Sequence, residues 1–301
     1  MKILVTGGTG FIGKHLVKFL IEKGSEVTIF DNFSNSEKDS VAVLVNIGTK
    51  IIEGDITKLD DVINATKNYD IVVHLAAKIS VEESIKNPSE TFHINVDGTR
   101  NVLIACEKNH VKKIIVASSA AVYGESLSGI KLTEDSKTDP ISPYGESKVM
   151  MEHEIREFIT KHNVNCVILR FFNIYGVGQS PEYAGVITKF IKRIATNKPL
   201  EIFGDGMQTR DFVSIKDAID SIYDAIENGK NGIYNIASGK TVTIKELAEF
   251  MISLSGKDLE IIYSDAKEGD IRFSQADISL AKKELGYLPK HGLEEIKNLL
   301  N

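Results

Sequence analysis

The chain has 301 residues, of which 42% are hydrophobic and 26% are charged, and its formal net charge is -6. This composition suits a globular protein with a full core, and the mixed charges contain no basic block of the kind that binds nucleic acid. No apolar run reaches the roughly 18 residues that a membrane-spanning helix needs, so we expect no membrane partner. Residues 1–5 predict the first strand of a cytoplasmic protein rather than a signal peptide. The two cysteines, Cys106 and Cys166, are too few for a metal quartet or a disulfide framework, so no metal is expected.

The first half of the chain alternates short β-branched runs with longer amphipathic stretches. Continuous apolar runs are typical of strands that are covered on both faces. The expected strands are residues 2–5, 26–30, 50–52, 71–74, 113–117 and 166–170, and the expected helices are residues 11–23, 60–66, 89–109 and 143–162. Strand and helix alternating in this way predict an α/β fold, a Rossmann-like doubly wound parallel sheet that binds its ligand at the carboxyl ends of the strands.

The pattern changes after about residue 176, where Gly- and Asp-rich turns join further helical stretches. Helices are expected at residues 185–196, 214–228, 243–254 and 278–285. The strand-like residues 232–236 are expected to return to the main sheet. We therefore predict a dinucleotide-binding domain over 1–175, with a returning segment near 205–240, and a smaller C-terminal α/β substrate lobe over 176–301.

A glycine-rich loop follows the first expected strand and opens the first expected helix. Residues 6–13 read TGGTGFIG, which places Gly7, Gly10 and Gly13 three residues apart. Glycines allow a tight turn and a close approach of the backbone to a pyrophosphate, and the helix N-terminus offers N–H groups to that anion. This context predicts a dinucleotide site.

The second expected strand leads into Asp31, eighteen positions after Gly13. A carboxylate at about this spacing accepts hydrogen bonds from the ribose hydroxyls and repels a 2′-phosphate, which favours NAD over NADP. Asp55 and Ile56 follow the third strand, where they are expected to meet the adenine. The fourth strand ends at His74, which we interpret as a packing residue, and the small residues after it let the backbone pass close to the cofactor: Leu75, Ala76 and Ala77.

Tyr144 and Lys148 lie four residues apart at the start of an expected helix, after Pro143. This spacing puts both side chains on one helix face. The ammonium is expected to lower the pKa of the phenol, so that Tyr144 can act as a base near neutral pH.

Two hydroxyl residues, Ser118 and Ser119, follow the fifth expected strand at the same edge of the sheet. A hydroxyl there can hydrogen-bond a reacting sugar oxygen, and we choose Ser119 for that role. The alternative is that both serines only satisfy backbone groups of the loop.

Together these motifs resemble the extended short-chain dehydrogenase/reductases, within the NAD-dependent epimerase/dehydratase family. The resemblance runs nearly end to end. Its more specific parts are residues 169–173 (LRFFN), 204–212 (GDGMQTRDF) and 268–272 (EGDIR), because simple short-chain dehydrogenases lack the sugar-nucleotide lobe that carries them.

The resemblance implies roles for individual residues. The residues that would contact NAD, beyond the glycines and the 75–77 segment, are Phe11, Ile12, Asp31, Asn32, Asp55, Ile56, Asn95, Tyr144, Lys148 and Phe172. Ser119 and Tyr144 would face the hexose. The residues that would hold the nucleotide diphosphate are Asn173, Val186, Arg210, Asp270 and Arg272, the last as compensation for Lys267, which stands where many relatives have Arg.

Within the family, the chain is most similar to members that invert carbon 4 of a UDP-hexose such as UDP-glucose or UDP-galactose through a 4-keto intermediate. Sugar-nucleotide dehydratases carry acidic residues directly after the catalytic hydroxyl, whereas this chain has Ala120 and Ala121. Ser274 lies four residues after Asp270, where relatives restricted to unmodified hexoses often have Tyr, so an N-acetylated hexose is also expected to fit.

Two other functions stay open. One is an NAD-dependent oxidoreductase with net turnover, such as a 4-keto-sugar reductase or a threonine-type dehydrogenase, and the other is an NAD-binding sensor without catalysis. The resemblance also implies a homodimer in which the helices at 89–109 and 143–162 form a four-helix bundle.

Overall fold

The structure is a computed structural model of the whole chain. It describes residues 1–36, 38–162, 164–179, 185–266 and 271–300.

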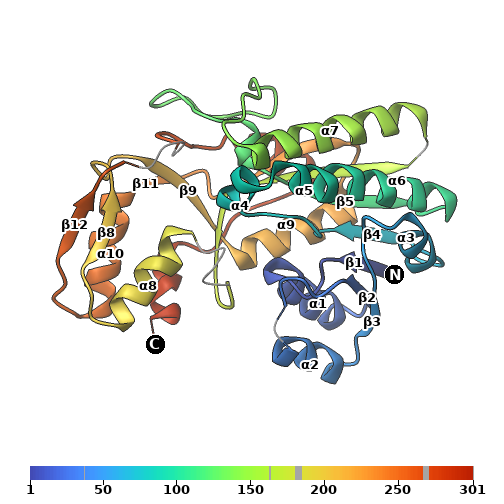
Figure 1. Ribbon diagram of the computed structural model, residues 1–301, viewed down its shortest axis with the longest axis horizontal. Coiled ribbons are helices and arrows are strands. Elements are labelled where there is room, and N and C mark those ends of the chain that lie inside the picture. The colour runs from blue at the N-terminus through green and yellow to red at the C-terminus, as the bar shows by residue number, and fades with distance from the viewer. Residues whose placement is uncertain (37, 163, 180–184, 267–270, 301) are drawn as a thin grey trace.

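A seven-stranded parallel sheet forms the centre of the larger lobe (Figure 1). Its spatial order is β10-β6-β5-β4-β1-β2-β3, so the order reverses between β1 and β4, as in a doubly wound fold. The strands are β1 (Lys2–Thr6), β2 (Glu26–Asp31), β3 (Lys50–Glu53), β4 (Ile71–His74), β5 (Lys113–Ser119), β6 (Asn165–Phe171) and β10 (Gly232–Ile236). The predicted fold class is confirmed, and residues 232–236 do return to the main sheet, beside β6.

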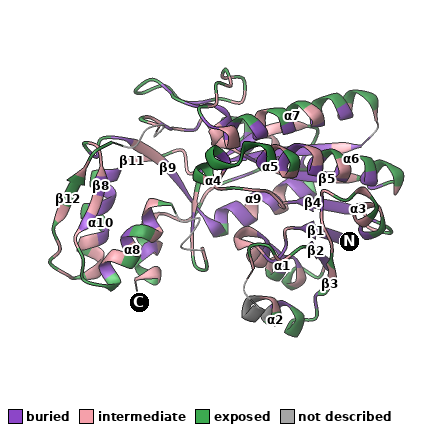
Figure 2. Cartoon of the chain, in the orientation of Figure 1, coloured by how far each residue is buried: buried purple, intermediate pink, exposed green. Residues whose placement is uncertain are grey.

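Successive side chains of the strands enter two different cores, one on each face of the sheet. In β1, Ile3 and Val5 belong to one core and Leu4 to the other. Helices α1 and α9 cover the first face, and α3, α6 and α7 cover the second (Figure 1). This two-sided cover explains why the strands read as uninterrupted apolar runs, and Figure 2 shows their central residues as buried.

The helices largely match the expected ranges, except that those at 38–46 and 81–86 were not expected. They are α1 (Phe11–Glu22), α2 (Lys38–Asn46), α3 (Leu59–Ala65), α4 (Val81–Lys86), α5 (Pro88–Phe92), α6 (Gly98–Lys108), α7 (Pro143–Lys161), α8 (Val186–Ala195), α9 (Ile215–Asn228), α10 (Ile244–Ser255) and α11 (Ser279–Leu285). Short 3-10 segments lie at η2 (Ala120–Val122) and η4 (Leu293–Leu299). Helix α7 begins at Pro143, and the Oγ of Ser142 caps it by accepting a hydrogen bond from Gly145 N.

One expected helix is interrupted. Residues 89–109 were expected to form a single α-helix, but a π-helical turn, η1 (His93–Asp97), separates α5 from α6. A π turn has i→i+5 hydrogen bonds and occurs as a single turn inside a longer helix, which is too short to be recognised from the hydrophobic pattern.

The C-terminal residues build a smaller lobe around a third core (Figure 1). It holds a three-stranded sheet in the order β11-β9-β7 and a two-stranded sheet of β12 and β8. These strands are β7 (Asn173–Tyr175), β8 (Leu200–Phe203), β9 (Thr209–Ser214), β11 (Thr241–Thr243) and β12 (Ile261–Ser264). The division at residue 176 into two functional domains stays a prediction. Among the described helices, none is both long and apolar enough to cross a membrane.

Candidate active site

The glycine loop between β1 and α1 has no room for side chains. Gly7 has a φ of +68°, and a Cβ there would lie 2.6 Å from Ala76 N. A Cβ on Gly13 would lie 2.4 Å from the carbonyl oxygen of Gly7. The loop therefore packs directly against its own backbone and against the chain that follows β4, which leaves the start of α1 accessible.

The N-terminus of α1 presents a positive helix end. Its N-cap is Gly10, which makes no side-chain cap hydrogen bond, and the first turn contains no acidic residue. Phe11 and Ile12, the first two residues of the helix, are half-buried. This end can therefore receive an anion such as a pyrophosphate.

Asp31 at the end of β2 is tied to the glycine loop. Its carboxylate accepts hydrogen bonds from Thr9 N at 3.0 Å and from Phe33 N at 2.9 Å. Sequence reasoning assigned Asp31 to the ribose alone and did not identify Thr9, whose side chain is buried. The carboxylate thus also fixes the shape of the loop.

Asn32 and Asp55 are hydrogen-bonded to each other across the ends of β2 and β3. Partial burial would raise the pKa of Asp55, but hydrogen bonds from Thr57 and Asn32 outweigh it and lower that pKa. Ile56 beside it is buried, and a Cβ on Gly98 would lie 2.7 Å from its Cδ1. Strands β2 and β3 therefore bring three of the predicted cofactor residues to one edge of the sheet.

Asn95 lies in the π turn and faces inward. Its Nδ2 donates to the carbonyl oxygen of Lys78 at 2.9 Å and to Ser147 Oγ at 2.9 Å, and its Oδ1 accepts from Lys78 N at 2.8 Å. Asn95 thus braces the chain that follows Ala77 against α7. Its contact with NAD stays a prediction.

His74 at the end of β4 is buried and uses both ring nitrogens. Nδ1 lies 2.7 Å from Thr6 Oγ1, and Nε2 lies 3.0 Å from Thr99 Oγ1. Burial, with the nearby charge of Lys148, lowers the pKa of His74 to about 3, so the ring is neutral. This geometry agrees with a packing role.

The structure brings Ser119 and Tyr144 together, from β5 and from the first turn of α7. Their side chains are hydrogen-bonded to each other, and Ser119 Oγ also accepts from Ala121 N at 3.2 Å. The backbone of Tyr144 is held at both ends: its N–H donates to Ser84 Oγ at 3.1 Å, and its carbonyl accepts from Ser147 Oγ at 2.7 Å. Sequence reasoning missed Ser84, because nothing in the short helix α4 marks a residue that contacts α7.

The two neighbouring serines have different partners. Ser118 Oγ points away from Tyr144 and donates to Glu152 at 2.6 Å. Ser119 is half-buried, whereas Ser118 is 4% exposed. Of the two serines, Ser119 is therefore the one whose hydroxyl lies beside Tyr144.

Lys148 lies one helical turn after Tyr144, almost fully buried. Its Nζ donates to the carbonyl oxygen of Ala117 at 2.9 Å. Burial lowers the pKa of Lys148 to about 8, although the negative charge of Glu152 opposes this. The residue therefore titrates within reach of physiological pH.

The pKa of Tyr144 differs in direction from the sequence-based expectation. Burial raises it, and the hydrogen bond with Ser119 only partly offsets that effect. Lys148 was expected to lower this pKa, and for the protein alone the expected direction was wrong, because burial of the phenol is the largest effect.

The residues predicted to hold the nucleotide come from both lobes. Phe172, which was predicted to contact NAD, is buried, and its ring centroid lies 6.2 Å from that of Tyr123. Asn173, predicted to hold the substrate nucleotide, is exposed at the start of β7. Val186 is the first residue of α8, and Arg210 in β9 donates to the carbonyl oxygen of Thr209 at 2.8 Å. Asp270 and Lys267 lie outside the described residues.

Arg272 is already held by two carboxylates. Its guanidinium pairs with Asp205 at 2.7 Å, and its backbone N–H donates to Glu125 at 2.8 Å. Glu125 also accepts from Phe273 N at 3.1 Å, so it ties this segment to the loop that follows Ser119. Sequence reasoning did not identify Glu125 or Asp205 as partners, since both precede their contacts by long stretches of chain.

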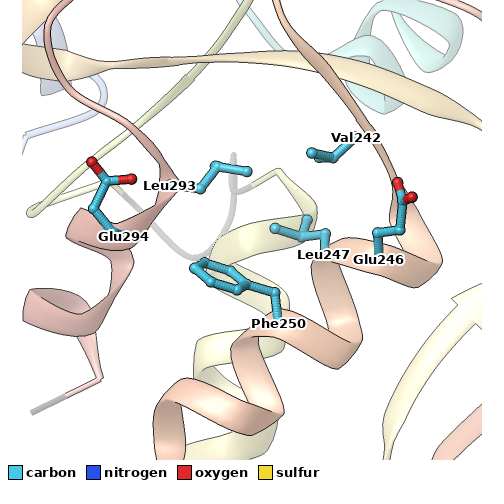
Figure 3. A pocket seen from close by; sticks show the side chains of 6 residues that line it. All are labelled: Val242, Glu246, Leu247, Phe250, Leu293 and Glu294. Carbon is cyan, nitrogen blue, oxygen red and sulfur yellow. The ribbon is translucent and has the colours of Figure 1, made fainter.

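A separate hollow of about 330 Å³ opens in the smaller lobe between α10 and η4 (Figure 3). It is lined by Val242, Glu246, Leu247, Phe250, Leu293 and Glu294. None of the predicted site residues lines it. The candidate active site is thus the edge where β1, β2, β4 and β5 end, not this hollow.

Comparison with known proteins agrees with this geometry. The sequence model of the NAD dependent epimerase/dehydratase family matches residues 3–237. A protein from Methanocaldococcus jannaschii described as a putative UDP-glucose 4-epimerase is 40% identical over 99% of this chain and 97% of its own length.

Two solved structures are also similar throughout. UDP-glucose 4-epimerase from Thermotoga maritima, solved with UDP-glucose, has a TM-score of 0.94 and 34% identity, and the match covers 100% of this chain and 97% of that one. UDP-N-acetylglucosamine 4-epimerase from Methanobrevibacter ruminantium has a TM-score of 0.91 and 35% identity, with 99% and 95% covered.

Proposed function

Because this chain belongs to the NAD dependent epimerase/dehydratase family, we propose that it is an NAD-dependent epimerase that inverts carbon 4 of a UDP-hexose. The substrate pair we propose is UDP-glucose and UDP-galactose. Relatives described as UDP-glucose 4-epimerases support this proposal.

The observation that carries the proposal is the hydrogen-bonded pair of Ser119 and Tyr144, with Lys148 one turn further along α7. The residues that follow Ser119 are Ala120 and Ala121, which offer only methyl groups. Elimination of water needs a second acid and base in this stretch, whereas epimerisation needs one proton carrier. The side chains present therefore favour epimerisation over dehydration.

The described residues fit NAD. Any Cβ at Gly7 or Gly13 would collide with backbone, so the loop keeps the close approach that a pyrophosphate needs. The open helix end at Gly10 and the carboxylate of Asp31 lie on either side of this loop. We propose that the remaining contacts are made by Phe11, Ile12, Asn32, Asp55, Ile56, Leu75, Ala76, Ala77, Asn95, Tyr144, Lys148 and Phe172.

In the proposed mechanism Tyr144 accepts the proton of the sugar C4 hydroxyl, and Ser119 orients that oxygen by hydrogen bonding. Bound NAD supplies a reversible two-electron acceptor, whose positive charge also favours ionisation of Tyr144. Lys148 in its charged form stabilises the phenolate. The 4-keto sugar then rotates in the site so that its opposite face meets the cofactor. Tyr144 returns the proton to the oxygen on C4.

The nucleotide is expected to stay anchored while the hexose turns. We propose that Asn173, Val186, Arg210 and Asp270 hold the UDP group, with Arg272 as a further cation. Arginine suits this role because its guanidinium pairs bidentately with phosphate. The sugar itself is then held weakly, which lets either face of the ketone be reduced.

Incubation of the purified protein with UDP-galactose, without added NAD, tests the proposal. We expect UDP-glucose to form while the absorbance at the wavelength of reduced nicotinamide stays constant, because the cofactor is restored in each turnover. Net formation or consumption of NADH would instead indicate the oxidoreductase. Binding of NAD with no conversion of any UDP-sugar would indicate the sensor.

Ser274 provides a test of substrate range. It is 6% exposed and small, and we propose that it leaves room for a 2-acetamido group. Ser274→Tyr is expected to lower kcat/KM for UDP-N-acetylglucosamine by roughly tenfold or more through overlap with the added ring, and to leave kcat/KM for UDP-glucose within about threefold. Equal losses on both substrates would contradict this role, and steady-state rates on both sugars decide it.

We also propose a homodimer formed by α6 and α7. Ile104 on α6 and Met150 on α7 are apolar side chains that are 38% and 48% exposed. Burying such side chains against a second copy is favourable, as in a four-helix bundle.

A further inference from the structure

A charged pair lies buried directly behind the candidate active site. Arg170 in β6 donates to both carboxylate oxygens of Glu152 in α7, with Nε to Oε1 at 2.9 Å and Nη2 to Oε2 at 2.6 Å. The two side chains are 1% and 4% exposed. Neither residue was singled out in the sequence, although a charged residue on the buried face of a helix and another inside an apolar strand are each unusual.

Helix α7, which carries Glu152, is connected to the end of β5 at two points. Ser118 Oγ donates to Glu152 Oε1 at 2.6 Å. Lys148, one helical turn before Glu152, donates to the carbonyl oxygen of Ala117, the residue before Ser118. Helix α7 and strand β5 are therefore joined side by side by two polar contacts, immediately before Ser119.

Further contacts fix Arg170 from behind. Its Nη1 donates to Tyr123 Oη at 2.8 Å and to the carbonyl oxygen of Glu134 at 3.1 Å. Tyr123 Oη in turn donates to Asn235 Oδ1 in β10 at 2.6 Å. The carboxylate of Glu152 is thus held from two strands, by Ser118 in β5 and by Arg170 in β6, and Arg170 is itself fixed by further contacts.

A buried ion pair is weak support for stability, because desolvation of both charges offsets their attraction. Replacing such a pair with hydrophobic residues of similar volume is often neutral for stability or even stabilising. The directed contacts to β5 suggest instead a role in the geometry and charge of the neighbouring site.

We propose that Glu152, held by Arg170 and Ser118, is a positioning residue that keeps Lys148 charged and fixes α7 against β5, so that Tyr144 meets Ser119. This inference rests on the proposed function for its kinetic consequences. The structural and electrostatic consequences can be measured without it.

The groups around the Lys148 ammonium are few among the described residues. They are His74 on β4, the Sδ of Met151 at 3.8 Å and Glu152 on α7, and the carbonyl oxygen of Ala117 on β5, with Tyr144 one turn earlier on α7 and Arg170 on β6 beyond Glu152. His74 is neutral, and Tyr144 is neutral until it ionises. Glu152 is therefore the negative charge that supports the protonated form of Lys148. Burial lowers the pKa of Lys148 and Glu152 raises it, and the two effects together place that pKa at about 8.

The first test is Glu152→Gln, which keeps the shape of the side chain and removes its charge. Without that charge the pKa of Lys148 falls further below 8, by roughly one unit or more. In 13C-lysine NMR, the signal of Lys148 is the one that titrates near pH 8 and is absent from Lys148→Arg. In Glu152→Gln the titration midpoint of this signal should move to lower pH. In the activity profile of the same variant, the upper limb of kcat should move to lower pH by a similar amount, with KM within about twofold.

Glu154→Gln is the matched control. Glu154 lies two residues further along α7 and also binds an arginine with both oxygens, Arg100 at 3.0 and 2.9 Å, but both side chains are partly exposed. Glu154→Gln should leave the titration of Lys148 and the pH profile of kcat unchanged. A shift of equal size in both variants, or in neither, overturns the proposal.

Ser118→Ala keeps the ion pair of Glu152 and Arg170. It is the second test of the positioning role, and it can be used if Glu152→Gln does not fold. Loss of this one hydrogen bond should leave the protein folded, yet the misplacement of β5 should lower kcat roughly tenfold with little change in KM. An unchanged kcat overturns the positioning role. If the wild-type protein interconverts no UDP-sugars, the proposed function fails, and the NMR titration still decides whether Glu152 sets the charge of Lys148.

Discussion

Replacing Tyr144 with Phe is expected to lower kcat by roughly a hundredfold or more, the range for loss of a positioned acid–base group. The phenol is the group hydrogen-bonded to Ser119, and its backbone is fixed by Ser84 and Ser147. Phe keeps the ring and these backbone contacts, so the protein should fold normally and retain its NAD. The measurement is the rate of UDP-galactose conversion at saturating substrate, together with the NAD released on denaturation.

Tyr263→Phe is the control for this variant. Tyr263 lies in β12 of the smaller lobe and is 51% exposed. Loss of this hydroxyl in Tyr263→Phe should leave kcat unchanged. Near-normal turnover in Tyr144→Phe would remove Tyr144 from the role of proton carrier.

Gly13→Ala is expected to weaken the binding of NAD roughly a hundredfold. The added Cβ would lie 2.4 Å from the carbonyl oxygen of Gly7 and 2.6 Å from Gly8 Cα, and backbone atoms cannot swing away as a side chain can. Overpacking of this kind costs about 3 kcal/mol, which corresponds to a loss of roughly a hundredfold in affinity if the strain is expressed in the cofactor site. The dissociation constant of NAD, measured by calorimetry, and the thermal midpoint should both change.

Gly24→Ala separates steric overlap from the conformational effect of glycine. Gly24 follows the other end of α1, has a φ of +80°, and has no atom within 4 Å of its added Cβ. Its replacement should cost about 1 kcal/mol of stability through backbone strain alone and leave NAD affinity intact. An equal loss of NAD in both variants would show that the loop tolerates no change in α1 at all, and would contradict the steric argument.

The main sheet was predictable because each strand is buried on both faces, so its residues read as one apolar run. The expected range 71–74 coincides with β4 and 232–236 with β10. The strands of the smaller lobe were harder to predict from the sequence. Its strands β7 and β11 have three residues each, which is too short for a periodic pattern to emerge.

The candidate site divides in the same way. The glycine loop, Asp31, Ser119, Tyr144 and Lys148 were identified because their spacing relative to strand ends carries a chemical reason. Long-range partners such as Glu152 with Arg170, or Glu125 with Arg272, were not found, because which side chains meet depends on how distant segments pack. The pKa of Tyr144 was misjudged for the same reason, since the burial that raises it is a property of the folded protein.

The pairing of β10 with β6 has a consequence for synthesis of the chain. The outer edge of β6 has no neighbouring strand until Ile236 has been made, 65 residues after Phe171. At the usual rate of translation this takes roughly 3 to 13 seconds. Throughout that interval the nascent chain presents an open strand edge, a template on which other chains can aggregate. Fragments of the chain that end within these residues therefore keep this strand edge unpaired.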